Sequence, residues 1–209
     1  MGQLESARSA TSIFAKPFFT RQSPVTSPPY IRAPHPKTGI LPEPSTIKRI
    51  LGTGWVGQTK IHGHRCQLHV PAEGAKGVIA FTRQGKRHAK AMSDAMLKEV
   101  VRLFRPETGW NVVDAEWLKP EDKLFVFDYL KKEGRLLSKL AFPQRFELLP
   151  RAYISPHITT LPLLRDLKQC LDVLGSTDPH VEGLVFKSLT RIGFADTSVV
   201  RCVRRPGLR

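Results

Sequence analysis

The sequence has few cysteines and no long apolar run, and both absences exclude classes of protein. Cys66, Cys170 and Cys202 are odd in number and have no C-x-x-C spacing, which argues against a disulfide framework or a zinc site. No apolar run approaches the ~18 residues that cross a bilayer, and the N-terminus lacks the continuous apolar core of a secretory signal. We therefore expect a cytoplasmic protein in a reducing compartment, with no membrane partner.

Acidic residues are also scarce. The chain has 18 Asp and Glu against 33 Lys and Arg, which gives a net charge of +15 and an isoelectric point near 10.2. A chain with this positive charge favours polyanions as binding partners. DNA or RNA is preferred over a membrane surface because the sequence has no amphipathic lipid-binding stretch. Hydrophobic residues make up 41% and charged residues 24% of the chain, as in ordinary globular domains, so the composition argues against global disorder.

Proline divides the chain into two parts. Prolines stand at positions 17, 24, 28, 29, 34, 36, 42 and 44 among Ser and Thr. Proline fixes φ and removes a backbone donor, so residues 1–46 are predicted to form an extended arm, either loose or wrapped on the domain. Residues 47–209 are predicted to form one domain.

Regular hydrophobic patterns begin at Ile47. Strands are predicted at 56–70, 78–82, 111–118, 123–130, 180–187 and 198–203, and helices at 91–104, 135–149 and 163–174. The short polar connection at 119–122 predicts that the strands on either side of it are antiparallel neighbours. Because strands and helices are segregated rather than strictly alternating, we predict an α+β domain of antiparallel sheets flanked by helices.

Two short strings about 120 residues apart carry the strongest chemical signal. KIHGHR at 60–65 and EGLVFK at 182–187 each place an ionisable side chain beside a glycine in a strand-forming run. A lysine becomes a nucleophile when desolvation or a neighbouring cation deprotonates its amine, and Arg65 can supply such a charge near Lys60. Gly63 allows the backbone to approach a ligand closely. The two strings indicate a covalent nucleotide-transfer site.

Three histidines on the first predicted strand, His62, His64 and His69, invite a metal assignment. No acidic residue or cysteine accompanies them at ligand spacing, so the sequence does not predict a histidine metal site.

Three further strings lie between the first two: TRQG at 82–85, DAE at 114–116 and FDYL at 127–130. In order and spacing the five strings resemble the motifs of the covalent nucleotidyltransferase superfamily, which contains ATP-dependent DNA ligases, RNA ligases and mRNA-capping enzymes. The likeness runs from about Trp55 to Arg204 and is greatest to the DNA ligases. It implies an ATP-grasp-like nucleotidyltransferase (adenylation) domain and, because only five residues follow Arg204, one without a C-terminal OB-fold.

The resemblance also assigns roles to residues. Lys60 would attack the α-phosphate of ATP and carry AMP. The nucleotide-binding residues would be Gln58, Thr59, Arg65, Glu116, Phe127, Lys187 and Arg201, with Phe127 stacking on adenine. The residues that contact nucleic-acid phosphate would be Arg83, Lys86 and Arg87. Glu116 and Glu182 would hold Mg²⁺, which prefers hard carboxylate and phosphate oxygens.

Several positions depart from the ligase pattern. His62 stands where the family has an aspartate, and Ala115 where it has a glycine. Gln58 replaces the glutamate that reads the adenine amino group in DNA ligases, which leaves GTP open beside ATP because an amide both donates and accepts. The last motif, usually Trp-x-Lys-x-Lys, is represented by 199–204, where Arg201 replaces the first lysine.

Three functions follow from these observations. We favour an ATP-dependent polynucleotide ligase, a monomer that seals 5′-phosphate/3′-OH nicks in DNA through a lysyl-AMP intermediate. An RNA ligase of the same superfamily is the nearest alternative. A non-catalytic, ligase-like nucleic-acid-binding module is the third, and a separate OB-fold or other protein partner remains open for all of them.

Overall fold

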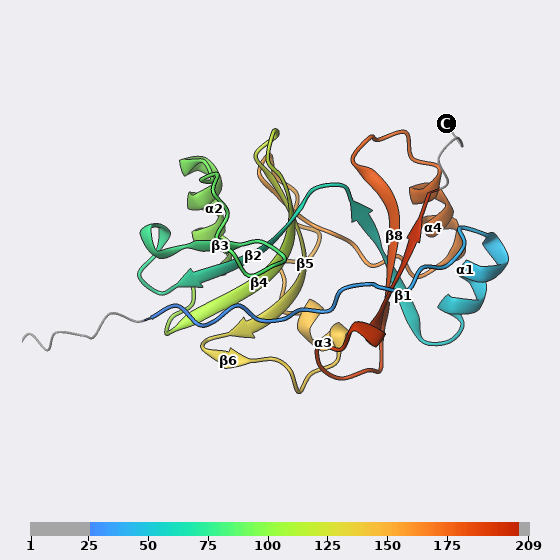
Figure 1. The fold of residues 1–209 in the computed structure, drawn as a ribbon, viewed down its shortest axis with the longest axis horizontal. Coiled ribbons are helices and arrows are strands. Elements are labelled where there is room, and N and C mark those ends of the chain that lie inside the picture. The colour runs from blue at the N-terminus through green and yellow to red at the C-terminus, as the bar shows by residue number, and fades with distance from the viewer. Residues whose placement is uncertain (1–25, 205–209) are drawn as a thin grey trace, which may run out of the picture.

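The computed structural model describes residues 26–204, which are built on two sheets (Figure 1). The smaller sheet contains β1 (Trp55–Ile61), β8 (Val181–Ser188) and β9 (Val199–Val203), in the order β1-β8-β9, and both of its pairings are antiparallel. Its strands come from both ends of the domain, so it forms only when residues more than about 120 positions apart meet.

The larger sheet has six strands. In spatial order these are β3 (Ile79–Phe81), β2 (His64–Pro71), β4 (Trp110–Leu118), β5 (Lys123–Lys132) and β6 (Arg135–Leu136), with β7 (Ile158–Thr160) beside β5. All pairings are antiparallel except that of β5 with β7. The predicted antiparallel neighbours on either side of 119–122 are β4 and β5, and this prediction is confirmed.

Within the described residues, four α-helices flank the sheets: α1 (Pro44–Leu51), α2 (Asp94–Phe104), α3 (Phe142–Phe146) and α4 (Leu167–Leu174). The Ser93 side chain caps α2 by accepting a hydrogen bond from the Met96 amide at 3.1 Å. Met96, Val100 and Phe104 recur every four residues and bury one face of α2. None of the helices in residues 26–204 has the length and apolar character needed to traverse a bilayer.

Each sheet has its own hydrophobic core. Val100 and Phe104 of α2 pack with Leu68, Val113 and Trp117 of the larger sheet. A second cluster joins α1 and α4 to the smaller sheet, through residues that include the following: Ile47, Cys170, Leu184, Phe186 and Cys202. All three cysteines are buried and free. A third cluster, with Ile61, Leu118 and Val181, joins the two sheets, and beside it charged side chains gather between them.

Two predicted elements were wrong. The single strand predicted over 56–70 is interrupted at His62 and Gly63, because β1 and β2 belong to different sheets and the chain turns between them. The helix predicted over 135–149 is confined to α3, and 135–136 forms β6. Leu137 donates its amide to the Leu130 carbonyl at 2.9 Å, so pairing with β5 replaces helical hydrogen bonds there.

The predicted boundary between residues 46 and 47 falls within α1. Residues 1–25 of the predicted arm lie outside the described residues. The remainder of the arm contacts both sheets, as the blue segment in Figure 1 illustrates.

Gly183 is required where β8 passes between β1 and β9. Its φ of +145° is rarely adopted by residues with side chains, and a Cβ there would overlap the Cys202 carbonyl oxygen and lie 3.0 Å from the Val203 Cα.

We expect Gly183→Ala to lower the free energy of unfolding by about 3 kcal/mol or more, as urea denaturation would measure. Gly52→Ala is the control, since its Cβ would meet only ordinary contacts. Equal stability of the two variants would contradict this account.

Candidate active site

A cavity of about 410 Å³ lies between the two sheets. Its wall includes nine of the twelve predicted site residues: Gln58, Thr59, Lys60, Arg65, Arg83, Glu116, Phe127, Glu182 and Lys187. These residues come from β1 and β8 of the smaller sheet and from β2, β4, β5 and the β3–α2 loop of the larger part. The fold therefore brings residues from all five sequence strings to one cavity.

Lys60 meets Glu182 across the β1–β8 pair. Lys60 is in register with Gly183, and its amine forms an ion pair with the Glu182 carboxylate. The other carboxylate oxygen contacts Nδ1 of His62, the residue that departs from the ligase pattern. Glu182 thus joins two basic side chains at the cavity wall, and its negative charge favours the ammonium form of Lys60 while this contact lasts.

Glu116 approaches the same region from β4. It pairs with Arg65 of β2 in the sheet register. Burial raises the pKa of Glu116 to about 7, against the opposing effects of Arg65 and Lys60. A Cβ on Gly63 would lie 3.0 Å from the Glu116 Cγ and 3.0 Å from the Trp117 carbonyl oxygen, so the glycine lets the β1–β2 turn pack against this carboxylate.

The environment of Lys60 opposes its positive charge overall. Burial lowers the pKa of Lys60, the Glu116 carboxylate counteracts this, and the Arg201 guanidinium adds to it. A lowered pKa increases the fraction of free amine, the form that acts as a nucleophile.

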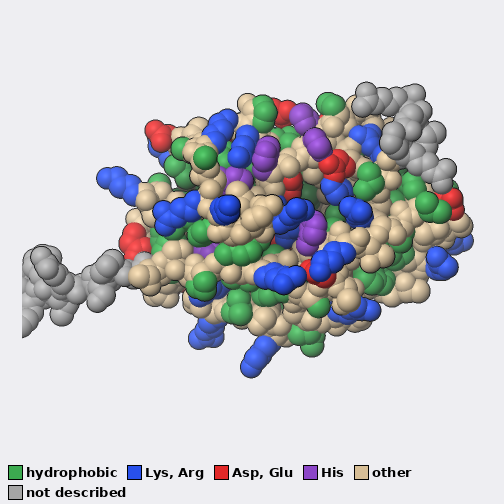
Figure 2. Space-filling view, in the orientation of Figure 1, with side chains coloured by type: hydrophobic (Ala, Val, Ile, Leu, Met, Phe, Trp, Pro, Cys, Tyr) green, Lys and Arg blue, Asp and Glu red, His purple; other side chains and the backbone are tan. Residues whose placement is uncertain are grey.

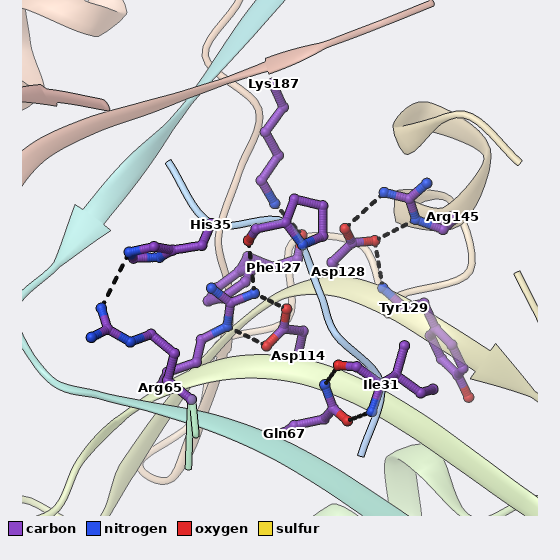
Figure 3. Close-up of polar contacts among 12 residues, drawn as sticks. Ile31, His35, Arg65, Gln67, Asp114, Phe127, Asp128, Tyr129, Arg145 and Lys187 are labelled. Atoms are coloured by element: carbon purple, nitrogen blue, oxygen red, sulfur yellow. Dashed lines mark hydrogen bonds and ion pairs between the residues drawn. The ribbon is translucent and has the colours of Figure 1, made fainter. Parts of the chain in front are cut away.

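Arg65 is held by Asp114 rather than left free. Its guanidinium forms a two-point ion pair with the Asp114 carboxylate and donates to the Pro34 carbonyl at 3.3 Å (Figure 3). The guanidinium also lies 5.0 Å from the centroid of the Phe127 ring. The charge is therefore fixed in the cavity wall, beside the ring predicted to stack on a base.

Lys187 is buried beside the same ring. Its amine donates to the Phe127 carbonyl at 3.1 Å and lies 4.7 Å from the Phe127 centroid and 4.2 Å from that of Phe142. Burial lowers the pKa of Lys187 to about 8, although Asp128 and Asp114 oppose the shift. Figure 3 shows this amine pointing toward the acidic groups of the larger sheet.

A second buried ion pair supports this region. Arg145 donates two hydrogen bonds to the Asp128 carboxylate, each at 3.0 Å, and further bonds to the carbonyls of Leu140 and Gly193. Both side chains are almost fully buried. The pair fixes α3 against β5, so that Phe142 is placed beside Lys187.

Gln58 presents an unpaired acceptor. Its side chain is 2% exposed, and Nε2 donates to the Leu161 carbonyl at 3.1 Å. Oε1 is buried and has no hydrogen-bond partner among the described residues. The Leu161 contact fixes the orientation of the amide, because a carbonyl oxygen can only accept. Oε1 is therefore a buried acceptor that lacks a donor among the described residues.

Three predicted residues are not among those that line the cavity. Lys86 and Arg87 are exposed in the turn after Arg83, and Arg201 is exposed on β9. The backbone of Arg201 exchanges hydrogen bonds with Thr38 and Ile40 at 3.0 and 2.9 Å. The positive charge of Arg201 lowers the pKa of Lys60.

The sequence patterns did not single out several residues of the cavity wall: Pro34, His35, Pro36, His88, Asp114, Asp128, Phe142 and Arg145. Asp114 and Asp128 were visible inside the DAE and FDYL strings, and acidic residues in otherwise apolar strands signal buried partners. No local signal marks His35, since its part in the site depends on where the N-terminal segment crosses.

No group of three or more His, Cys, Asp or Glu side chains arranged to hold a metal occurs within 26–204. Four carboxylates line the cavity, and two of them, Asp114 and Asp128, are held by Arg65 and Arg145. The other two are the predicted metal ligands Glu116 and Glu182. Two carboxylates suit Mg²⁺, which is commonly held by one or two of them together with substrate phosphates and water.

Two solved structures share the fold. Mycobacterial DNA ligase D complexed with ATP and MES matches with a TM-score of 0.55 and 14% sequence identity, over 82% of this chain and 60% of that chain. A chain described as Pmar-Lig_Pre matches with a TM-score of 0.56 and 15% identity, over 82% of this chain and 46% of that chain. No protein-family model and no curated protein matches the sequence.

The chain thus shares its fold with DNA ligase chains, and the resemblance predicted from the five strings is confirmed at the level of the fold. It spans between about half and three fifths of the length of these two ligase chains. The prediction of an α+β domain of antiparallel sheets flanked by helices also agrees with the fold.

Lys187 makes the stability of the protein depend on pH. Its folded pKa of about 8 lies below the ordinary value of 10.5, so between these values the unfolded chain binds more protons and stability rises with pH. We expect Lys187→Met to reduce this rise and to raise the free energy of unfolding at pH 7 by about 1 kcal/mol or more, because a buried charge is removed.

Urea denaturation at pH 7, 8, 9 and 10 would measure both effects. Lys168→Met is the matched control, since Lys168 is an exposed residue of α4, and it should keep the wild-type pH dependence. A parallel rise in Lys187→Met and wild type would show that this amine is not desolvated as the fold implies.

Proposed function

We propose that this domain is an ATP-dependent polynucleotide ligase that seals 5′-phosphate/3′-OH nicks in DNA through a lysyl-AMP intermediate on Lys60. The observation that carries the proposal is the position of Lys60 in the wall of a cavity between two sheets. Its partly buried amine contacts Glu182, and the negative charge of Glu116 raises its pKa against the effect of burial. The fold of DNA ligase domains supports the same chemistry.

In the first step the Lys60 amine attacks the α-phosphorus of ATP. A P–N bond forms, the P–O bond to pyrophosphate breaks, and the nitrogen loses a proton. The lowered pKa of Lys60 increases the free amine available for this attack. Lys187 and Arg65 lie in the same wall and supply positive charge to the reacting phosphate.

Two transfers follow. An oxygen of the 5′-phosphate attacks the phosphorus of lysyl-AMP, the P–N bond breaks, and the Lys60 nitrogen regains a proton. The neighbouring 3′-OH then attacks the 5′-phosphorus, AMP leaves, and a phosphodiester bond remains. Arg83 stands at the exposed edge of the cavity, where it can bind the 5′-phosphate.

Gln58 favours adenine over guanine in this proposal. Its unpaired Oε1 can accept from the 6-amino group of adenine, whereas guanine presents a carbonyl oxygen at that position. Phe127 offers a ring face to the base. ATP is therefore the proposed nucleotide, although the sequence left GTP open.

Glu116 and Glu182 are the proposed ligands of Mg²⁺, which when bound neutralises phosphate charge. Their carboxylates reach the cavity from opposite sheets, and hard oxygen donors fit this ion. Glu182 also positions the Lys60 amine through their ion pair.

The charge of the surface supports a nucleic-acid substrate. Lys, Arg and His side chains gather on the face that carries the N-terminal segment, around a hollow that shows acidic groups (Figure 2). A net charge of +15 attracts the phosphate backbone of DNA at moderate salt. We propose that the protein acts as a monomer.

Covalent labelling tests the intermediate. With α-labelled ATP and Mg²⁺, we expect the wild type to retain acid-labile label on denaturing electrophoresis. In Lys60→Ala the amount of bound label should fall at least about 1,000-fold, because the nucleophile is absent. Lys168→Ala, which changes an exposed lysine far from the cavity wall, should label normally.

A folded wild type that binds nicked DNA in a salt-sensitive manner but takes up no label would instead support the non-catalytic module. Sealing of nicked RNA in preference to nicked DNA by the labelled protein would support the RNA ligase. Both assays use the same preparation.

Nucleotide choice tests Gln58. We expect Gln58→Leu, which removes the acceptor at similar size, to lower the ratio of ATP to GTP labelling roughly tenfold, because the pairing with the 6-amino group is lost. Gln58→Glu retains an acceptor and should keep the preference for ATP. The assignment is wrong if Gln58→Leu discriminates between the two nucleotides as the wild type does.

A further inference from the structure

The N-terminal segment crosses the cavity between the sheets as a strap, defined here as residues 31–40. At one end, Ile31 exchanges two hydrogen bonds with the Gln67 side chain of β2, at 2.9 and 2.8 Å. At the other end, Thr38 and Ile40 bond to the backbone of Arg201 on β9. The strap is therefore attached to both sheets, and the blue ribbon of Figure 1 shows this course.

The middle of the strap forms part of the cavity wall. Pro34, His35 and Pro36 line the cavity, and both prolines are buried. The His35 amide donates to Asp196 Oδ1 at 3.0 Å, and Lys37 forms an ion pair with the same carboxylate at 2.8 Å. Proline rings restrict φ and the Asp196 contacts hold the backbone, so the position of the His35 ring is well defined.

The His35 side chain meets Arg83. Its Nε2 lies 3.2 Å from Nη1 of Arg83, and Figure 3 shows the His35 ring turned toward a guanidinium group. A guanidinium has only donors, so this nitrogen must be the unprotonated acceptor of the imidazole. Burial lowers the pKa of His35, and the nearby charges of Arg83 and Arg65 act in the same direction, which keeps this acceptor available.

Arg83 depends on this contact for its orientation. The residue is exposed, and within 26–204 the structure gives its guanidinium no acceptor other than His35. The Tyr30 hydroxyl donates to the Arg83 carbonyl at 3.0 Å and so fixes its backbone but not its side chain. An exposed arginine without a partner samples many rotamers.

We propose that His35 is a positioning residue that orients the Arg83 guanidinium to bind a terminal 5′-phosphate of nucleic acid at the cavity edge. The inference rests on the proposed role of Arg83 and adds to it a residue from outside all five sequence strings. His35 takes one of the five N–H donors of Arg83, and the remaining donors stay available for phosphate oxygens.

Equilibrium binding tests this inference without catalysis. The affinity of the full chain for a nicked DNA duplex is measured with a 5′-phosphate or a 5′-OH at the nick, in the absence of ATP and Mg²⁺. The dissociation constant for the 5′-OH duplex is divided by that for the 5′-phosphate duplex. This ratio reports recognition of the phosphate alone, because every other contact is common to both duplexes. A general loss of folded protein would leave this ratio unchanged.

We expect His35→Leu to lower this ratio roughly fivefold and His35→Gln, whose amide oxygen restores an acceptor, to stay within about twofold of wild type. His35→Met provides a second apolar replacement should the leucine variant fail to fold. Arg83→Ala should abolish the discrimination, and His35→Leu should lower it no further in that background. His157→Leu is the matched control, since His157 bonds to Asp122 away from the cavity wall.

Unchanged discrimination in both apolar His35 variants would overturn the inference, as would equal losses in His35→Gln and His35→Leu. Unchanged discrimination in Arg83→Ala would overturn it together with the phosphate role of Arg83. A protein that shows the His35–Arg83 coupling but takes no label from ATP would support this inference and overturn the proposed enzyme, so the two failures are distinguishable.

Discussion

The antiparallel pairing of β1 with β8 is the constraint on which the site depends. It places Lys60 opposite Gly183, so the amine reaches the adjacent Glu182 carboxylate. The absence of a side chain at Gly183 allows β9 to pack on the other side of β8. Because the paired strands come from distant parts of the chain, the site assembles only when the smaller sheet has formed.

The walls of the cavity contain charge that would be costly to bury alone. Asp114 neutralises Arg65, and Arg145 neutralises Asp128, each through a two-point contact. Lys187 has no carboxylate in direct contact among the described residues, and its amine bonds to a carbonyl instead. A ligand that brings negative charge to Lys187 would relieve this cost.

Much of the fold was predictable because local patterns agreed with tertiary pairing. The strand-forming runs of β4 and β5 and their short polar connection predicted an antiparallel pair, and the spacing of apolar residues predicted the helix over 91–104, which contains α2. The helix predicted over 135–149 failed where β5 offered hydrogen bonds to Leu137. The strand predicted over 56–70 failed because hydrophobic alternation does not reveal a change of sheet.

The sequence by itself determined the chemical inventory: a lysine beside a glycine, two carboxylates, an aromatic ring and a strongly basic chain, in an order that resembles one superfamily. Only the tertiary structure decided that His35 contacts Arg83, that Arg65 is committed to Asp114, and that Arg201 is not among the residues that line the cavity. The physical reason is that these contacts depend on the path of a proline-rich segment and on inter-sheet distances. No local periodicity encodes either of them.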